Sequence, residues 1–454
     1  MFNLKFLNLL FLSILSTVIL WSSTDAHAEN SDILLTHYSD IAITTDLEPD
    51  DVLALYIIFQ KANDIYEEKG GAYPIKFIIV GEGETARKKA RMEYMLGKLI
   101  ALPDGVEVRV IEGTPSNDNI FAYDGDEIGE EILGTTDLKD IFDSPELTLA
   151  KCDYYKETGP VRTLERFLKK SPAPLLIVLK PPTELLSIKP ELLRNATVMM
   201  YGSFNFRKIV TDTKALASSA FDDVRHQGDT DKLQALLNFF ALHFKKVGIV
   251  ESYGMLGSQA SVFRDHEWSH DILQHIENSN EPFFIMFRKL VNNWNRYLFE
   301  KQLPDVKTAL LLLAEANQMP QIEVQTFVSQ LDQLAQKWDE EQFDQLVKNI
   351  DAMIAKSQSE ETTREKQLLS EKLHAEMHFA KLISPSSGLQ FTLADVCVAL
   401  ALVGDQSPFP ASPVELQVSD RGFLIPRHHP ESSTFYYDRV DNYEFAQRLL
   451  ELIM

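Results

Sequence analysis

The stretch Asp40-Ile-Ala-Ile-Thr-Thr-Asp46-Leu-Glu-Pro49-Asp-Asp-Val-Leu-Ala-Leu55 decides the fold that we predict for this chain. Its apolar run, Ile41 to Ile43 followed by two threonines, favours a strand that is buried on both faces. Pro49 suits the first turn of a helix, because its fixed φ matches helical geometry and its missing N–H costs nothing there. The stretch therefore predicts a buried strand, a tight loop and a helix.

Four carboxylates, those of Asp46, Glu48, Asp50 and Asp51, would crowd the end of this strand. In an open α/β sheet, ligands bind at the carboxyl ends of the strands. Crowded carboxylates repel each other unless a positive group lies among them, and Ca²⁺ takes about six to eight oxygen ligands. The alternative is a solvated acidic helix start, since the helix dipole favours carboxylates in the first turn.

The rest of the chain up to residue 250 alternates strand-like and helix-like segments. We expect strands at 74–80, 106–111, 174–179, 196–201 and 247–250, and helices at 86–102, 159–170 and 231–246. This alternation predicts an α/β fold with a mainly parallel sheet flanked by helices, a Rossmann-like core with right-handed crossovers.

The character of the sequence changes from about residue 283 to 385. This segment has few turn signals and predicts helices at 310–316, 324–338, 343–354 and 365–382, with apolar residues at the spacing of packed helices. Strand-like and helical patterns then resume at 393–400, 414–418 and 442–453. We divide the chain into a signal peptide (1–28), a first part of the α/β core (29–282), a helical insertion (283–385) and a C-terminal part of the core (386–454).

Length and charge narrow the classes of function. A chain of 454 residues allows two or three domains, or one large domain with insertions. Its net charge of −23 argues against nucleic acid as a partner, because nucleic acid binds to basic surfaces. The two cysteines, Cys152 and Cys397, do not form a disulfide framework, and whether they pair stays open.

The first residues have the pattern of a secretory signal peptide. Lys5 precedes an apolar segment, Phe6 to Trp21, and Ala26-His-Ala28 is a small-x-small cleavage site. We expect an exported protein, periplasmic or secreted, that starts at Glu29 and has no stable membrane insertion after cleavage. An uncleaved anchor is the alternative.

Several motifs carry a family resemblance. Asp46-x-x-x-Asp50-Asp51 resembles the aspartate signature of the inosine–uridine nucleoside hydrolases. Val178-Leu-Lys-Pro-Pro-Thr-Glu-Leu185 resembles the Gly-Pro-Leu-Thr-Asn loop of that family, and Asp395 resembles its late calcium-binding aspartate. Tyr123-Asp-Gly125 and Asp420-Arg-Gly422 fall where the family has a His-Gly loop and an Arg-Gly hairpin. In their order along the chain, these motifs resemble those of a divergent member of the nucleoside hydrolase family with a helical insertion.

The resemblance implies a Ca²⁺ ion bound by Asp46, Asp51, Asp395 and the backbone carbonyl of Leu179. It implies that Asp46 is also the general base and that Asp50 holds a ribose hydroxyl. The implied reaction is hydrolysis of the N-glycosidic bond of nucleosides or related ribosides, with water attacking the anomeric carbon. The implied partner is a small-molecule riboside, and a homo-oligomer or a protein bound by the helical insertion is a further expectation.

The chain also departs from the family pattern. Thr44 stands where the family has an aspartate, and Ala394 stands where it has the histidine that helps protonate the leaving base. Glu82 replaces the asparagine of a Gly-Asn loop, and Asn205 is the one remnant of the motifs that hold the ribose. We therefore expect Glu82 and Asn205 near a rewritten substrate site, and a catalytically altered binding protein is the alternative to an enzyme.

His266-Glu267-Trp-Ser-His270 matches the His-Glu-x-x-His pattern of zinc peptidases. On a helix, the two histidines would lie one turn apart and bind zinc, with Glu267 as the base. The flanking residues are polar, which does not favour a buried zinc helix. The other hypotheses are that His266 or His270 replaces the missing leaving-group acid, or that both lie on the surface.

Overall fold

The computed structural model describes residues 33–81, 85–113, 159–180, 182–202, 204–205, 216–217, 229–251, 261–262, 266–357, 364–382, 384, 388–404, 409–418, 424–437 and 440–454. The predicted signal peptide, Cys152 and both Gly-containing motifs at 123–125 and 420–422 lie outside these residues. Cys397 is a buried free thiol. Among the described residues, no helix combines the length and the apolar character that crossing a membrane needs.

A nine-stranded sheet forms the centre of the molecule, with the order β12-β11-β13-β8-β5-β4-β1-β2-β3. Seven strands are parallel: β1 (Ile41–Thr45), β2 (Ile75–Val80), β3 (Arg109–Glu112), β4 (Leu175–Leu179), β5 (Thr197–Tyr201), β8 (Lys246–Val250) and β13 (Thr434–Tyr437). β11 (Ala411–Val418) runs antiparallel to β13 and to β12 (Leu424–His428). The predicted mainly parallel α/β fold is confirmed.

The strand order reverses at β1. From β1 the chain proceeds outward through β2 to β3, and it then returns to the other side of β1 and proceeds outward through β4, β5 and β8. A crevice for ligands forms at such a reversal, outside the carboxyl ends of the strands. The end of β1, where Asp46 follows Thr45, lies at this point.

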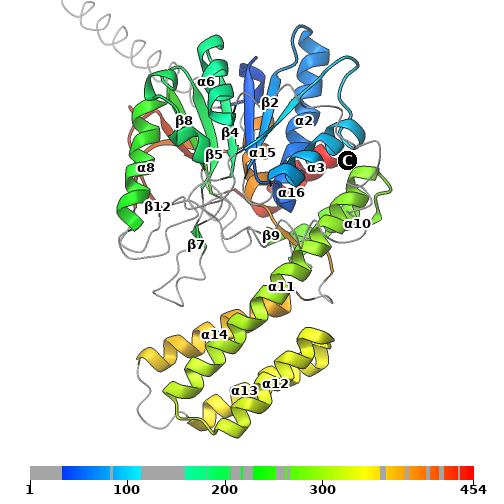
Figure 1. The fold of residues 1–454 in the computed structure, drawn as a ribbon, viewed down its shortest axis with the longest axis vertical. Coiled ribbons are helices and arrows are strands. Elements are labelled where there is room, and N and C mark those ends of the chain that lie inside the picture. Colours follow the sequence, from blue (N-terminus) through cyan, green and yellow to red (C-terminus); the bar gives the residue numbers. More distant parts are fainter. Residues whose placement is uncertain are drawn as a thin grey trace, which may run out of the picture.

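Helices cover both faces of the sheet (Figure 1). Ile41 and Ile43 pack against α2 (Pro49–Lys69), α3 (Thr85–Lys98), α15 (Ala394–Val403) and α16 (Asn442–Ile453). Ala42, on the opposite face, packs with α6 (Pro160–Lys170), α7 (Thr183–Leu186) and α8 (Asp229–His243). Burial on both faces explains why the strand sequences are continuously apolar.

Short elements complete this part of the chain. The described residues include the 3₁₀-helices η1 (Leu35–His37), η3 (Pro190–Leu192) and η6 (Glu267–Ser269), and η6 leads into α10 (His270–Asn278). Two small antiparallel pairs are β6 (Phe204–Asn205) with β7 (Leu216–Ala217), and β9 (Ser261–Val262) with β10 (Phe391–Thr392).

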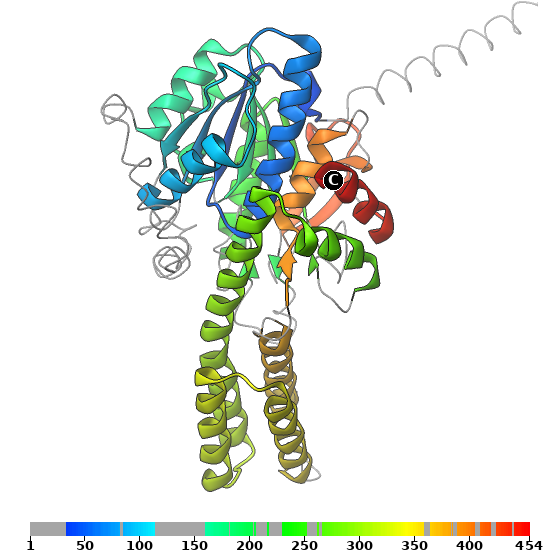
Figure 2. The same ribbon diagram turned by 90° about the vertical axis from the view of Figure 1, so that its right-hand side faces the viewer.

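Four helices project from the α/β part (Figures 1 and 2). They are α11 (Pro282–Ala316), α12 (Gln321–Gln336), α13 (Glu340–Ser357) and α14 (Arg364–Leu382), and they share a separate apolar core that includes Leu310, Leu331 and Ile350. The start of α11 belongs to the other core, because Phe283 and Phe287 pack with residues of α2 and α15. The domain boundaries at 282 and 385 stay a prediction.

Candidate metal centre

A strained turn joins β1 to α2. Leu47 is buried and has a φ of 57°, a left-handed conformation that costs a non-glycine residue about 1–2 kcal/mol. The Leu47 N–H donates to Thr45 Oγ1 at 3.1 Å, and Arg91 Nη1 donates to the Leu47 carbonyl at 3.3 Å. These contacts hold the reversal that places the end of β1 beside the start of α2.

The start of α2 has a capping box. The Glu48 N–H donates to Asp51 Oδ2 at 3.2 Å, and the Glu48 side chain accepts from the Asp51 N–H. Thr45 Oγ1 donates to Asp51 Oδ1. Asp51 therefore caps the helix, but its side chain is only 1% exposed, so the hypothesis of a solvated acidic helix start is wrong.

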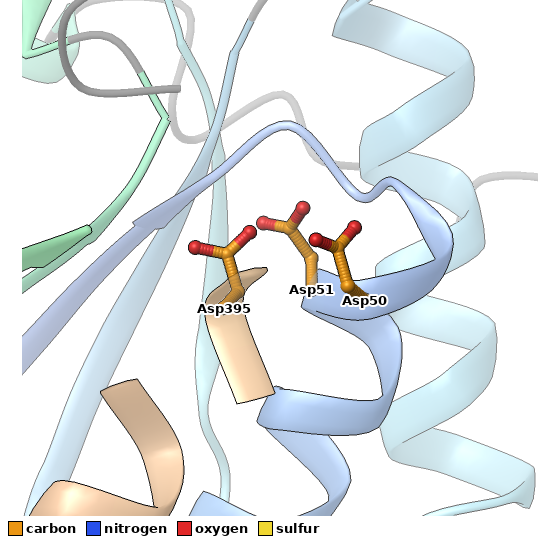
Figure 3. Close-up of side chains that lie close together, drawn as sticks. All are labelled: Asp50, Asp51 and Asp395. Atoms are coloured by element: carbon orange, nitrogen blue, oxygen red, sulfur yellow. The ribbon is translucent and has the colours of Figure 1, made fainter. Parts of the chain in front are cut away.

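Three aspartates converge from two helix starts (Figure 3). Asp50 and Asp51 lie in the first turn of α2, and Asp395 lies in the first turn of α15, which packs against α2. One carboxylate oxygen of each lies within 4.8 Å of the others, and all three residues are buried. Thr392 Oγ1 donates to Asp50 Oδ2 at 3.1 Å and fixes its orientation.

Burial and mutual repulsion raise the pKa values of these carboxyls. Burial, followed by the charge of Asp46, raises the pKa of Asp50 to about 6. Burial and the charges of Asp46, Asp395 and Asp50 hold the pKa of Asp51 well above its usual range. The pKa of Asp395 is likewise well above the usual range, because of burial and then the charges of Asp50 and Asp46. Ionisation of each of these carboxyls in the folded protein is therefore energetically unfavourable unless a cation binds beside them.

The site fits a hard divalent cation. Asp46 Oδ1 and Asp395 Oδ1 are buried and have no hydrogen-bond partner among the described residues. In the part of the chain that the structure describes, no lysine or arginine forms an ion pair with Asp46, Asp50, Asp51 or Asp395. Two helix N-termini supply roughly half a positive charge each, which is too little for four carboxylates. An oxygen-only donor set of this kind suits Ca²⁺ or Mg²⁺.

The observed position of one residue, Asp50, differs from the position that the family resemblance implies. Asp50, expected on a ribose hydroxyl, has an oxygen in the same close group as Asp51 and Asp395. Asp46 adjoins the group, since its charge raises the pKa values of Asp50, Asp51 and Asp395. Leu179, whose carbonyl was the fourth expected ligand, ends β4 directly opposite Thr45. The individual roles of these residues stay predictions.

The predicted substrate residues are less well described. Glu82 lies outside the described residues, as does the side chain of Asn205, whose backbone forms part of β6. Their expected roles stay predictions.

The zinc-peptidase geometry is not formed. His266 precedes η6 in an extended conformation (φ −92°, ψ 107°), and α10 begins only at His270. The motif needs both histidines on one helix, one turn apart, so this hypothesis is wrong. The His266 ring instead stacks on Trp268 at 6.0 Å, and His270 is exposed.

Sequence reasoning missed several residues of the site. Thr45, Thr392 and Arg91 position the turn and the carboxylates, but single threonines and arginines carry no sequence signal. A further pair, Lys180 and Glu184, is almost fully buried beside the end of β4, with Lys180 Nζ 2.7 Å from Glu184 Oε2. The four-residue Lys–Glu spacing after an apolar strand was a usable signal.

Close packing surrounds this buried pair. A Cβ on Gly81 would lie 2.7 Å from Lys180 Cε, and a Cβ on Gly113 would lie 2.9 Å from Glu184 Oε1. The ends of β2 and β3 therefore need glycine so that the lysine and the glutamate fit against them.

We expect Lys180→Met to destabilise the protein by about 3–5 kcal/mol, because Glu184 then stays buried without the lysine charge. Urea denaturation measures the loss. The double variant Lys180→Met/Glu184→Leu should recover most of the stability, since apolar residues often replace a buried ion pair without loss. A double variant as unstable as the single one would contradict this account of the pair.

Of the comparisons with known proteins, the one with solved structures found similar chains. No protein-family model and no curated protein matches the sequence. The chain is similar to a plant nucleoside hydrolase, the PpNRh1 enzyme, with 11% identity and a TM-score of 0.42 over 91% of this chain and 98% of that one. It is also similar to an inosine-guanosine nucleoside hydrolase, with 11% identity and a TM-score of 0.43 over 92% and 98%. We therefore draw the proposed function from the residues of this chain.

Proposed function

We propose that this protein is a Ca²⁺-dependent hydrolase of N-glycosidic bonds in nucleosides or related ribosides. The observation that carries the proposal is the buried group of Asp50, Asp51 and Asp395 at the reversal of the strand order. The closeness of these buried carboxylates supports a divalent cation at the position where small ligands bind in such sheets. The aspartate motifs of the sequence support nucleosides as the substrate class.

Each residue has a defined task in this proposal. Asp51, Asp395 and the Leu179 carbonyl would hold the cation, together with one oxygen of Asp46. Ca²⁺, when bound, would neutralise the carboxylates, orient a water molecule and lower its pKa. The Asp46 carboxylate takes the proton of the water molecule that attacks the anomeric carbon. Asp50 accepts a hydrogen bond from a ribose hydroxyl, and the carboxylates stabilise the positive charge of an oxocarbenium-like transition state.

Protonation of the leaving base is the step that distinguishes an enzyme from a binding protein. Ala394, the first residue of α15, carries no proton to donate. We propose His266 for this task. It lies four residues after β9, and β9 pairs with β10, whose Thr392 donates to Asp50. A riboside-binding protein without turnover is the second candidate, and the absence of a histidine at 394 favours it.

The test is calorimetric titration of the purified, chelator-stripped protein with Ca²⁺, followed by assays of base release from a panel of nucleosides. We expect saturable Ca²⁺ binding by the wild type, loss of hydrolysis in Asp46→Ala, and base release that depends on Ca²⁺. Hydrolysis that falls in His266→Ala only for substrates with poor leaving groups would support the acid role of His266.

A matched control is Asp441→Ala. Asp441 is an exposed helix N-cap of α16, where it accepts from the N–H groups of Tyr443 and Glu444 at 2.9 and 3.2 Å. The control variant should bind Ca²⁺ as the wild type does. Absence of Ca²⁺ binding by the wild type would overturn the proposal, and binding without any base release would favour the binding protein.

Export and partners complete the proposal. The signal-like N-terminus supports a periplasmic or secreted enzyme, and the projecting helices α11 to α14 offer a surface for a second copy or another protein. Cell fractionation and light scattering of the purified protein test these two points.

A further inference from the structure

A cavity lies at the amino ends of the strands, away from the candidate metal centre at their carboxyl ends. It is a groove of about 670 Å³ between α6 and the amino ends of β2 and β3. Lys76 is the second residue of β2 and Arg109 is the first of β3, whereas the aspartates of the metal centre lie at the carboxyl ends of the strands. The groove is therefore separate from the proposed catalytic site.

Cations from two walls face this groove. Arg166 and Lys170 come from α6, where they lie one turn apart with Thr163 on the same side of the helix. Lys76 and Arg109 come from the strands. Among the described residues that line the groove, Glu107 is the one carboxylate, against these four cations. Such a concentration of positive charge is unexpected in a chain with a net charge of −23.

The cations of the helix wall have no charged partner among the described residues. In the described ranges, neither Arg166 nor Lys170 forms an ion pair or a hydrogen bond through its side chain. Lys76 is only partly neutralised, since its Nζ lies 3.6 Å from Asp40 Oδ1 and donates to the Tyr73 carbonyl at 2.7 Å. Arg166 and Lys170 can therefore donate N–H groups to an anion in the groove.

The floor of the groove is apolar and aromatic. The buried rings of Phe77 and Phe167 meet edge to face at 5.2 Å, and both line the groove. The cavity is larger than one phosphate needs, and the apolar floor can contact an organic group. Multiple cations around an apolar floor match an anion that carries two or more charges on an organic body.

We propose that this groove binds a small phosphorylated molecule, with Arg166 and Lys170 holding the phosphate from α6 and Arg109 holding it from β3. The guanidinium groups of Arg166 and Arg109 suit bidentate contacts to phosphate oxygens, and Lys170 supplies a point charge. This binding site does not depend on the metal centre or on the proposed hydrolysis.

Calorimetric titration with inorganic pyrophosphate tests the groove on the full chain. The buffer contains a chelator, so that no metal bound by the aspartates can capture the probe. Its ionic strength is about 0.15 M, where a Debye length of about 8 Å screens the distant negative charges of the chain. We expect saturable binding that weakens at least about tenfold in Arg166→Gln/Lys170→Gln.

The helix provides a matched control. Arg162→Gln/Lys169→Gln removes the same charge from exposed positions of α6 that do not line the groove, and we expect less than about a twofold change in affinity. Arg109→Gln, on the opposite wall, should weaken binding as the first double variant does. No saturable binding by the wild type, or equal weakening in both double variants, would overturn the proposal.

Discussion

Asp51→Asn is expected to lower the affinity for Ca²⁺ at least about 100-fold and to abolish riboside hydrolysis. Asp51 is 1% exposed and adjoins all the other acids of the centre, since the charges of Asp46, Asp395 and Asp50 all raise its pKa. Changes to groups that only orient metal ligands already cost about 10–100-fold in affinity. Loss of a carboxylate ligand itself should cost no less, and calorimetric titration measures it.

The control for this prediction separates metal binding from helix capping. Asp51 completes a capping box with Glu48, so Asp51→Asn could act by weakening the start of α2. Asparagine keeps a side-chain oxygen that can accept from the Glu48 N–H, so the helix content of the metal-free variant should stay near the wild-type value. Because the charge of Asp51 opposes folding, the thermal midpoint of the metal-free variant should not fall. A variant that binds Ca²⁺ as tightly as the wild type would contradict the metal centre.

The second large effect concerns the stability of the metal-free protein, which we expect to fall as pH rises. Burial raises the pKa of Asp50 from 3.8 to about 6, so the folded protein binds more protons than the unfolded chain between these values. The stability linked to Asp50 is complete below pH 4 and is lost as pH rises through 6. Asp50 alone accounts for about 3 kcal/mol, and Asp51 and Asp395 act in the same direction.

Denaturation by urea in a chelator at pH 5, 6, 7 and 8 measures this fall. In saturating Ca²⁺ the fall should become smaller, because the ion binds the ionised carboxylates and favours the folded state.

Asp50→Asn is the matched variant for this pH dependence. It removes one of the titrating carboxyls, so the metal-free variant should be more stable than the wild type at pH 8 and have a weaker dependence on pH. In Ca²⁺ the order should reverse, because the variant lacks one of the negative charges that attract the ion to the neighbouring Asp51 and Asp395. Parallel stability curves for the two proteins in chelator would show that these carboxyls do not titrate as the structure indicates.

Local sequence signals predicted the elements whose causes are local. The last helix was expected at 442–453, and α16 has these bounds, with Asp441 as its N-cap. β1 and the start of α2 also lie where the apolar run and Pro49 indicate. In each case the capping group, the proline or the apolar run lies within a few residues of the element that it determines.

Elements that depend on distant partners were predicted poorly. β13 was missed, because it is a short strand inserted between β8 and β11, and its partners lie far from it in the sequence. The sequence predicted only 310–316 within α11, whereas the helix begins at Pro282 and continues through Pro304. Packing of Phe283 and Phe287 in the main core stabilises its first turns beyond what local propensity provides.

The metal centre shows the same division. The sequence alone placed Asp46, Asp50 and Asp51 at one strand end, because strand, loop and helix follow each other directly, and the family motifs suggested Asp395. Only the tertiary structure brought Asp395 and Thr392 to that end, with Thr392 and Asp50 342 residues apart in the chain. It also separated the two histidines of the zinc-like motif. Spacing along a chain determines local geometry, whereas a binding site needs the packing of α15 on α2, which depends on the whole core.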